Sequence, residues 1–322
     1  WADIIKSSAI DRAQFNHLAD LYLSAENVIF TWAMGITHHD HGVENVESIV
    51  NLALLRGMIG KKNAGLLPLR GHSNVQGVGS MGVTPALKDT VLKKLEKQMK
   101  FTVPQTNGLD TMGCIESSYE GEIDFAFLMG GNLYAATPDS QYSEQALSNV
   151  PFKVFLTTTL NQSHFFGIGE ETIILPVAAR DEEKQPTTQE SMFNFLRMSD
   201  GGIVRLNNVR SEIDIIADIA AGTMGNDKID FSTFKNHANI RDAIGQIIPG
   251  FEKIKDIDRT KDEFQIGNRT FHKPEFSTID RNAIFKTIKI PPEKGKNGQF
   301  KMTSIRSEGQ FNTIIYEEAD TF

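Results

Sequence analysis

Arg70 stands in a loop whose residue types suit the binding of an anion. The stretch LRGHSNVQGVGSMGVTP, residues 69–85, places four glycines and several hydrogen-bonding side chains around this arginine. A guanidinium group can orient a carboxylate or a phosphate through two parallel hydrogen bonds, and glycines let the backbone approach a ligand closely. The same residues are equally compatible with a surface arginine in a structural ion pair. The local pattern therefore leaves both roles open.

A cluster of three histidines and an aspartate, HHDHG at residues 38–42, suggests a metal ion. Only His38 and His41 have the i, i+3 spacing that places two ligands on one side of a helix. The HExxH pattern of zinc proteases does not occur in the sequence. Asp40 could instead cap a helix over residues 42–57. A metal-dependent hydrolase that uses His38 and His41 is one alternative, and a polar loop before a helix is the other.

Two further polar segments follow apolar runs. Gly130-Gly131-Asn132 ends the run EIDFAFLM, and Thr157-Thr158-Thr159 ends the run FKVFL. Glycines at such a position let a phosphate or nucleotide approach the backbone, although a tight turn needs glycines as well. The threonines could bind the same ligand or cap a helix. Neither GxGxxG nor GxxxxGK[ST] is present, so a nicotinamide cofactor or a P-loop nucleotide receives little support.

The elements that would position these residues alternate between helices and buried strands. Helical spacing of apolar residues predicts helices over 11–25, 42–57 and 87–99, and continuous apolar runs predict strands in ENVIFTWAMG, over 123–129, in FKVFLTTTLNQ and in ETIILP. This alternation indicates an α/β fold, with Rossmann-like parallel sheets covered by helices on both faces. In such sheets ligands bind at the carboxyl ends of the strands. Here those ends are Met34-Gly35, the glycine pair and the threonines.

Composition narrows the function classes. The 322 residues carry a net charge of −8, which argues against a nucleic-acid-binding surface. No run reaches the roughly 18 apolar residues of a membrane span. The single cysteine, Cys114, excludes a disulfide framework, a CxxC pair and a cysteine-held iron–sulfur cluster within this chain. We expect Cys114 to be a small packed residue at the start of a helix.

Changes in amino-acid composition along the chain suggest three regions. Residues 1–181 form the α/β region, which could consist of two subdomains split near residue 70. Residues 182–295 are mixed helical and irregular, and residues 296–322 begin a β-rich element with TIIYEE. Twenty residues cannot bury a core of their own. Together with the initial Trp1, this leads us to expect an internal fragment whose last segment opens a truncated C-terminal dinucleotide-binding domain.

Several segments, in this order, resemble the molybdopterin oxidoreductases, a family that includes formate dehydrogenases and periplasmic nitrate reductases. The matching segments are TWAMGITHHDHGVENVESIVNLALLRGMIGKKNAGLLPLRGHSNVQG, FLMGGNLYAATPDS, FLTTTLNQSHFFGIGEETIILP and IRSEGQFNT. GHSNVQG and RSEGQFNT are most similar to a branch of formate-dehydrogenase-alpha-like proteins of unknown substrate. The resemblance implies a bis-molybdopterin guanine dinucleotide cofactor with molybdenum or tungsten. Such a long, phosphorylated group needs the close backbone approach and the amides that residues 70–82 offer.

The resemblance also assigns residues. Arg70 would be catalytic, because it would hold an anionic substrate beside the metal and stabilise charge that develops during oxidation. The residues that would contact a pterin are Met34, His38, His72, Asn74, Gln76 and Gly77. Those that would contact a guanosine or its phosphates are Gly131, Asn132, Asp139, Thr157 and Thr158. From the last domain, a pterin would be contacted by Arg306, Gln310, Phe311 and Asn312. Formate dehydrogenases usually have glutamine where His38 and His72 stand. The metal-ligating residue and any iron–sulfur cluster would lie outside this chain.

The sequence thus predicts part of a molybdenum or tungsten oxidoreductase that exchanges two electrons with a small substrate, formate being the first choice, and passes them to a partner protein. We expect a cytoplasmic protein without a membrane segment, and an isolated fragment without activity. A non-catalytic cofactor-binding module, or a degenerate paralogue, is the rival interpretation.

Overall fold

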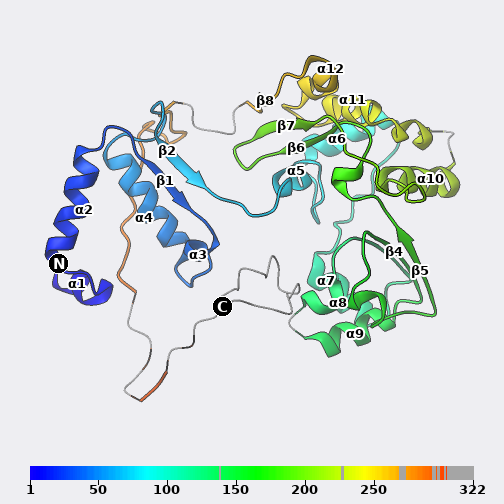
Figure 1. The fold of residues 1–322 in the computed structure, drawn as a ribbon, viewed down its shortest axis with the longest axis horizontal. Coiled ribbons are helices and arrows are strands. Elements are labelled where there is room, and N and C mark those ends of the chain that lie inside the picture. Colours follow the sequence, from blue (N-terminus) through cyan, green and yellow to red (C-terminus); the bar gives the residue numbers. More distant parts are fainter. Residues whose placement is uncertain are drawn as a thin grey trace. The chain divides into compact units, whose positions relative to one another are not determined.

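The computed structural model describes residues 1–137, 139–225, 228–267, 273–291, 295, 298–300 and 302 (Figure 1). The chain folds into two compact units. Unit 1 comprises Trp1–Ser73, Met192–Asn194 and Gly267–Thr303, and unit 2 comprises Asn74–Ser191, Phe195–Ile266 and Ser304–Phe322.

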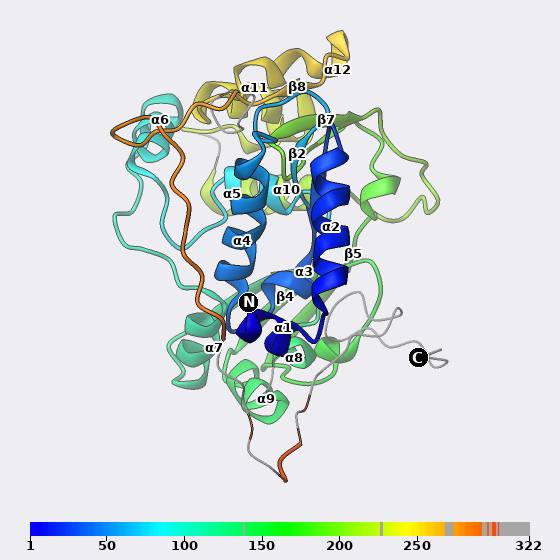
Figure 2. The same ribbon diagram turned by 90° about the vertical axis from the view of Figure 1, so that its left-hand side faces the viewer.

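Unit 1 is built on a parallel strand–helix–strand arrangement. β1 (Ile29–Trp32) pairs with β2 (Gly65–Pro68) in parallel, and α3 (Met34–Thr37) and α4 (Gly42–Leu55) lie in the connection between them. α1 (Ala2–Ser8) and α2 (Arg12–Ser24) precede the first strand. Arg56, at the end of α4, donates a hydrogen bond of 2.9 Å to the carbonyl of Ala25, at the end of α2. This contact anchors α2, which is seen together with α4 in Figure 2.

A three-stranded parallel sheet forms the first layer of unit 2. β3 (Phe125–Met129), β4 (Phe152–Thr157) and β5 (Glu171–Pro176) pair in chain order. All six residues of β4 lie in the sheet centre, where Val154 and Leu156 pack against Ile215 of α10 (Glu212–Met224). The connections carry α8 (Leu133–Ala136), α9 (Ser140–Ser148) and the 3-10 helix η1 (Gln162–His164), and α7 (Thr111–Tyr119) precedes β3.

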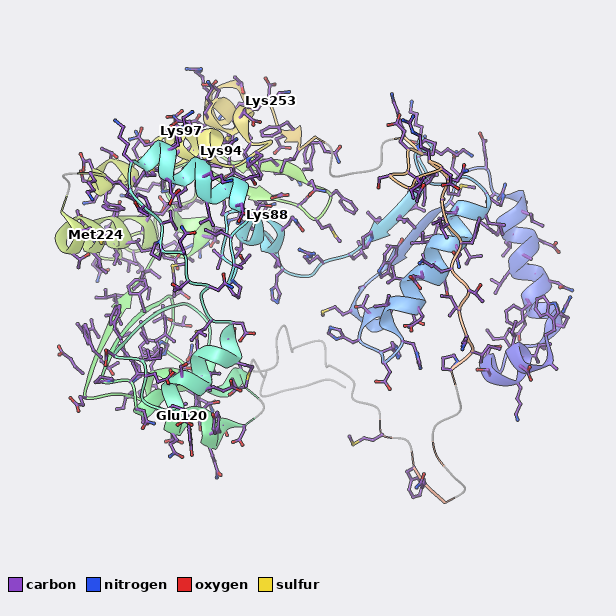
Figure 3. The ribbon with its side chains drawn as sticks, turned by 180° about the vertical axis from the view of Figure 1, so that it is seen from behind. Lys88, Lys94, Lys97, Glu120, Met224 and Lys253 are labelled. Atoms are coloured by element: carbon purple, nitrogen blue, oxygen red, sulfur yellow. The ribbon has the colours of Figure 1, made fainter. Side chains whose placement is uncertain are left out.

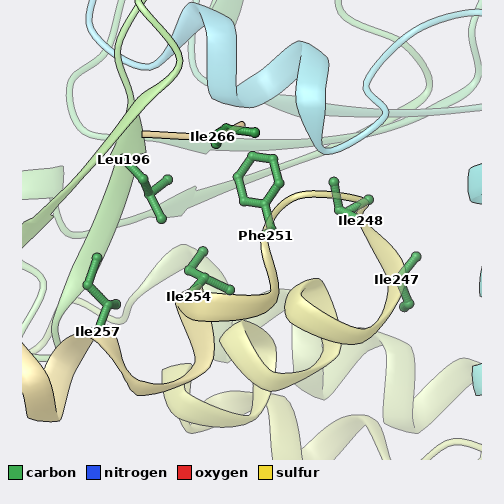
Figure 4. Close-up of a cluster of buried hydrophobic side chains, with 7 residues drawn as sticks. All are labelled: Leu196, Ile247, Ile248, Phe251, Ile254, Ile257 and Ile266. Atoms are coloured by element: carbon green, nitrogen blue, oxygen red, sulfur yellow. The ribbon is translucent and has the colours of Figure 1, made fainter. Parts of the chain in front are cut away.

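An antiparallel sheet and a helical layer complete unit 2. β6 (Thr187–Glu190), β7 (Phe195–Ser199) and β8 (Phe264–Gln265) form the sheet. Its neighbours are α5 (Val75–Ser80), α6 (Asp89–Met99), α11 (His237–Ile247), α12 (Ile257–Thr260), η2 (Arg180–Glu182), η3 (Phe231–Lys235) and η4 (Glu252–Asp256). Their buried core consists of Leu196, Ile247, Ile248, Phe251, Ile254, Ile257 and Ile266 (Figure 4). Val91, Leu95 and Met99 of α6 pack against this core.

The predicted α/β class with parallel sheets flanked by helices is confirmed. The antiparallel sheet is an addition, because the sequence indicated only mixed helical and irregular structure over 182–295. Of the β-rich element expected over 296–322, the predicted strand TIIYEE and all of residues 303–322 lie outside the described residues. None of the described helices is long and apolar enough to cross a membrane. The predicted three-region division stays a prediction.

Candidate functional site

In unit 1 the segments of Met34 and Arg70 leave the same edge of the parallel strand pair. Trp32 is paired with Pro68, and the amide of Leu69 donates to the carbonyl of Trp32 at 2.7 Å. The next residues of the two strands therefore lie side by side at the carboxyl edge, where ligands of parallel sheets bind. Met34 begins α3 and is 47 % exposed, and the Arg70 side chain is also exposed.

The loop between α3 and α4 holds the histidine cluster. His38 ends α3 and is exposed, and the His39 ring shares a 2.8 Å hydrogen bond with the carbonyl of Gly35. The prediction that Asp40 is the N-cap residue of α4 is wrong: His41 is the N-cap residue, and its side chain makes no capping hydrogen bond. Backbone carbonyls set the start of the helix, because His39 accepts from the amide of Gly42 and His41 accepts from the amide of Asn45, both at 2.9 Å.

No metal site is assembled from these histidines. Among the residues described, no group of three or more His, Cys, Asp or Glu side chains is placed to hold a metal ion. The geometry therefore offers nothing in favour of a hydrolase that uses His38 and His41.

Unit 2 begins inside the GHSNVQG motif. His72, in the part of the motif that belongs to unit 1, is exposed. Asn74 is the N-cap residue of α5 and has a left-handed backbone, φ 62°. The Oδ1 atom of Asn74 accepts a 3.0 Å hydrogen bond from the amide of Glu190, at the end of β6. Gly77 is buried beside that side chain, and Gln76 is partly buried. This half of the motif thus joins α5 to the antiparallel sheet.

The glycine pair after β3 forms an open turn at the carboxyl edge of the parallel sheet. Gly130 and Gly131 have φ values of 67° and 76°, a region in which residues with a Cβ atom are strained. A Cβ atom at either position would meet nothing within 4 Å. The space beside both glycines is therefore open, and their backbone conformation, not crowding, is what favours glycine here.

Two residues that sequence reasoning missed fix this turn. Asn161 donates from Nδ2 to the carbonyl of Gly131 at 2.8 Å. Ser163 donates from its hydroxyl to Oδ1 of Asn132 at 2.6 Å and accepts from the amide of Tyr134 at 3.0 Å. The only available signal was the polar NQS that follows the threonines at the end of β4.

The two predicted threonines have different surroundings. Thr157 is buried, and its hydroxyl donates to the carbonyl of Thr159 at 2.6 Å, whereas Thr158 is exposed. Asp139 caps α9, because its Oδ1 atom accepts from the amide of Tyr142 at 3.0 Å. Of these three side chains, Thr158 is the one best placed to meet a ligand.

A cavity of about 280 Å³ lies beyond the end of β5. Its walls come from Ala178, from residues 182–185, 204–206 and 209–211, and from Asp214 of α10. The amide of Val177 donates to the carbonyl of Thr157, and the amide of Ala178 donates to the carbonyl of Arg210. Ala178, which follows β5 by two residues, lines the cavity, whereas residues 130–132 and 157–159 do not. Burial raises the pKa of the nearby Glu212, and the carboxylate of Glu183, which lines the cavity, raises it further.

The remaining predictions concern the C-terminal segment and Cys114. Arg306, Gln310, Phe311 and Asn312 lie outside the described residues. Cys114 is exposed, so the expectation of a packed thiol is wrong. The buried side of α7 consists of Ile115 and Ser118, and Cys114 lies off that side.

Comparisons with known proteins identify the family of the chain. The family described as molybdopterin oxidoreductase matches residues 12–220. The chain is 32 % identical, over 99 % of its length, to a Mycobacterium tuberculosis protein named uncharacterized oxidoreductase, and 32 % identical over its whole length to protein YdeP of Escherichia coli K12. It covers 42 % and 44 % of these two relatives.

A third relative carries a named activity. The alpha subunit of the F420-dependent formate dehydrogenase of Methanocaldococcus jannaschii is 34 % identical over 48 % of this chain and 24 % of its own length. The family match covers both parallel strand sets, from α2 to α10, and therefore both carboxyl edges described above. The chain belongs to the molybdopterin oxidoreductase family.

Proposed function

We propose that this chain supplies a cofactor-binding part of an oxidoreductase that carries bis-molybdopterin guanine dinucleotide with molybdenum or tungsten. The supporting observation is the open Gly130–Gly131 turn at the carboxyl edge of the parallel sheet, together with Asn132 and the exposed Thr158. A nucleotide with phosphates requires backbone amides that it can approach and hydroxyl or amide groups nearby. These residues therefore fit one guanosine diphosphate arm of such a cofactor.

Each unit would contribute its own set of contacts. In unit 2, Gly131, Asn132 and Thr158 would contact the nucleotide, Thr157 and Asp139 would hold the backbone around it, and Asn74, Gln76 and Gly77 would lie beside a pterin. In unit 1, Met34, His38 and His72 would contact a pterin from the exposed carboxyl edge of β1 and β2. When bound, the metal of the cofactor supplies two-electron chemistry, and the protein supplies binding and orientation.

Arg70 would bind the substrate. Its guanidinium group is exposed at the edge of unit 1 and can hold a carboxylate with two hydrogen bonds. Formate is the first substrate to test, because one relative is named as a formate dehydrogenase subunit. Electrons would pass to a partner protein, and we place the enzyme in the cytoplasm.

The experiment is a metal and cofactor analysis of the complete protein that contains this chain. Molybdenum and tungsten are measured by mass spectrometry, and pterin is measured as its fluorescent product after acid oxidation. We expect one metal ion and about two pterins per chain. A folded preparation from a cofactor-producing host that contains neither would contradict the proposal and favour a non-catalytic module.

The isolated 322-residue chain gives a second measurement. We expect it to be inactive with formate, since the proposed metal ligand lies outside it. Formate oxidation by the isolated chain with bound molybdenum would contradict this.

A further inference from the structure

Helix α6 carries a concentration of positive charge that contrasts with the rest of the chain. Residues 88–100, KDTVLKKLEKQMK, hold five lysines and two acidic residues, whereas the whole chain has a net charge of −8. Lys93, Lys97 and Lys100 recur at i, i+4 and i+7, so they share one side of the helix. All three are exposed.

The opposite side of α6 faces the core of unit 2. Val91, Leu95 and Met99 pack against the cluster that contains Phe251 and Ile254. The orientation of the helix is therefore fixed by burial, and the lysines are held on the outside. Glu96, one of the two acidic residues, is turned away, because its Oε1 atom accepts a 3.0 Å hydrogen bond from the amide of Val103.

A neighbouring element extends the positive surface. Lys253 of η4 is exposed, and Figure 3 shows it on the same side of unit 2 as Lys94 and Lys97 of α6. Lys94 lies close enough to Glu252 to contribute to the lowered pKa of that carboxyl, whose largest causes are hydrogen bonds from the amides of Glu252 itself and Gly250. We define the lysine face as Lys93, Lys94, Lys97, Lys100 and Lys253. Within the described part of the chain, none of these five side chains forms an ion pair.

We propose that the lysine face is the docking surface for an acidic electron-transfer protein. The occupant is argued from charge complementarity: a local positive patch on an acidic molecule steers and orients a partner of negative charge. The inference rests on the proposed oxidoreductase function, which requires a partner that accepts or donates electrons.

The residue types of the face indicate a transient complex. Residues 88–100 contain no arginine, tryptophan or tyrosine, the residues that dominate binding energy in long-lived interfaces. Exposed lysines act as hydrated point charges and mainly accelerate association. A weak, salt-sensitive encounter is the kind that redox partners use. The absence of arginine and aromatic side chains also makes a nucleic acid the poorer choice.

The test measures binding of the complete protein to immobilised flavodoxin, an acidic redox protein, with the basic cytochrome c as the opposite probe. We expect flavodoxin to bind at low salt and to lose about tenfold in affinity or more when NaCl is raised from about 20 to 200 mM. The double variant Lys93→Glu, Lys97→Glu should lose about tenfold or more at low salt. The matched control, Lys62→Glu with Lys289→Glu, reverses two exposed lysines of unit 1 and should stay within about twofold of the wild type.

Three outcomes would overturn the proposal. Equal losses in both double variants would show an effect of net charge alone. Loss of cytochrome c binding in Lys93→Glu, Lys97→Glu as large as the loss of flavodoxin binding would exclude charge complementarity at the lysine face. The third outcome comes from acetylation of the complete protein, measured by mass spectrometry, which should modify Lys93 and Lys97 as fast as Lys62. Slower modification of Lys93 and Lys97 would show that another part of the same protein covers the lysine face. These readouts need neither metal nor pterin, so they remain valid if the cofactor analysis fails.

Discussion

The side-chain oxygen of Asn74 occupies the space that a Cβ atom at Gly77 would need. The same oxygen accepts the hydrogen bond from the amide of Glu190, which ties α5 to β6. Gly77 therefore permits a link between two elements that are more than a hundred residues apart in sequence.

We predict that Gly77→Ala destabilises unit 2 by about 1–3 kcal/mol, because the added methyl group displaces the Asn74 side chain and leaves the Glu190 amide without its partner. The measurement is urea unfolding followed by circular dichroism. Gly79→Ala is the matched control: it lies in the same helix, and its Cβ atom would meet nothing within 4 Å. Equal destabilisation by both substitutions would contradict the prediction.

Gly131→Ala should separate backbone strain from cofactor binding. Gly131 and Gly121 have nearly equal left-handed φ values, 76° and 74°, and a Cβ atom at either would meet nothing within 4 Å. Each alanine should cost about 1 kcal/mol of stability through strain alone. If Gly131 contacts the cofactor, only Gly131→Ala lowers the metal and pterin content of the complete protein. A loss of the same size in Gly121→Ala would mean that the strain, not the contact, is responsible.

Lys153 should make stability depend on pH. Its side chain is fully buried in β4, and its ammonium group donates to the carbonyl of Val150 at 2.7 Å. Burial lowers the pKa of Lys153 from 10.5 to about 8. The unfolded chain therefore binds this proton more tightly than the folded chain, so the free energy of unfolding rises with pH between about 8 and 10.5. The rise is at most ~3 kcal/mol.

Lys153→Met keeps most of the side-chain volume and removes the charge. We expect it to raise the free energy of unfolding at pH 7 by roughly 1–3 kcal/mol and to flatten the curve in the alkaline window. Lys289→Met, at an exposed position, should leave the curve unchanged. Retention of the alkaline rise in Lys153→Met would assign it to another group.

Arg70→Ala should lower kcat/KM for formate by about two to three orders of magnitude, with benzyl viologen as electron acceptor, because the guanidinium group would hold the carboxylate and stabilise developing charge. Arg70→Lys keeps the charge but loses the paired hydrogen bonds, so it should recover only part of the rate. Metal and pterin content should stay at the wild-type level. Arg259→Ala, an exposed position in unit 2, is the control. Full activity of Arg70→Ala would remove the proposed role.

Sequence predicted the parallel strands best, for a physical reason. β3, β4 and β5 appear in the sequence as continuous apolar runs, which are typical of parallel strands. Their burial differs from that expectation: the central strand β4 is buried, whereas β3 and β5 each contain exposed as well as partly buried residues. The strands β6 and β7 were missed, because TTQE is polar throughout and FLRMS mixes polar and apolar residues. The hairpin between them turns at Asn194, whose backbone is left-handed with φ 55°. The sequence Met192-Phe193-Asn194 does not predict this turn.

The site was predicted unevenly. The turn at Gly131 and Asn132 could be located because it follows a clear strand. Asn161 and Ser163 could not be assigned, since their role depends on a strand–loop–strand pairing that brings them to a residue about thirty positions away. The N-cap residue of α4 was also predicted wrongly, because the helix begins where the backbone carbonyls of His39 and His41 accept from the amides of Gly42 and Asn45.

The chain order of the parallel strands in unit 2 also bears on how the protein is made. β3, β4 and β5 pair with their nearest neighbours in sequence, so the only loops that must close to form the sheet are residues 130–151 and 158–170. Short closures cost little entropy and favour early formation. During synthesis this sheet can assemble as soon as residue 176 has left the ribosome. The proposed nucleotide would then meet a glycine turn that is already folded.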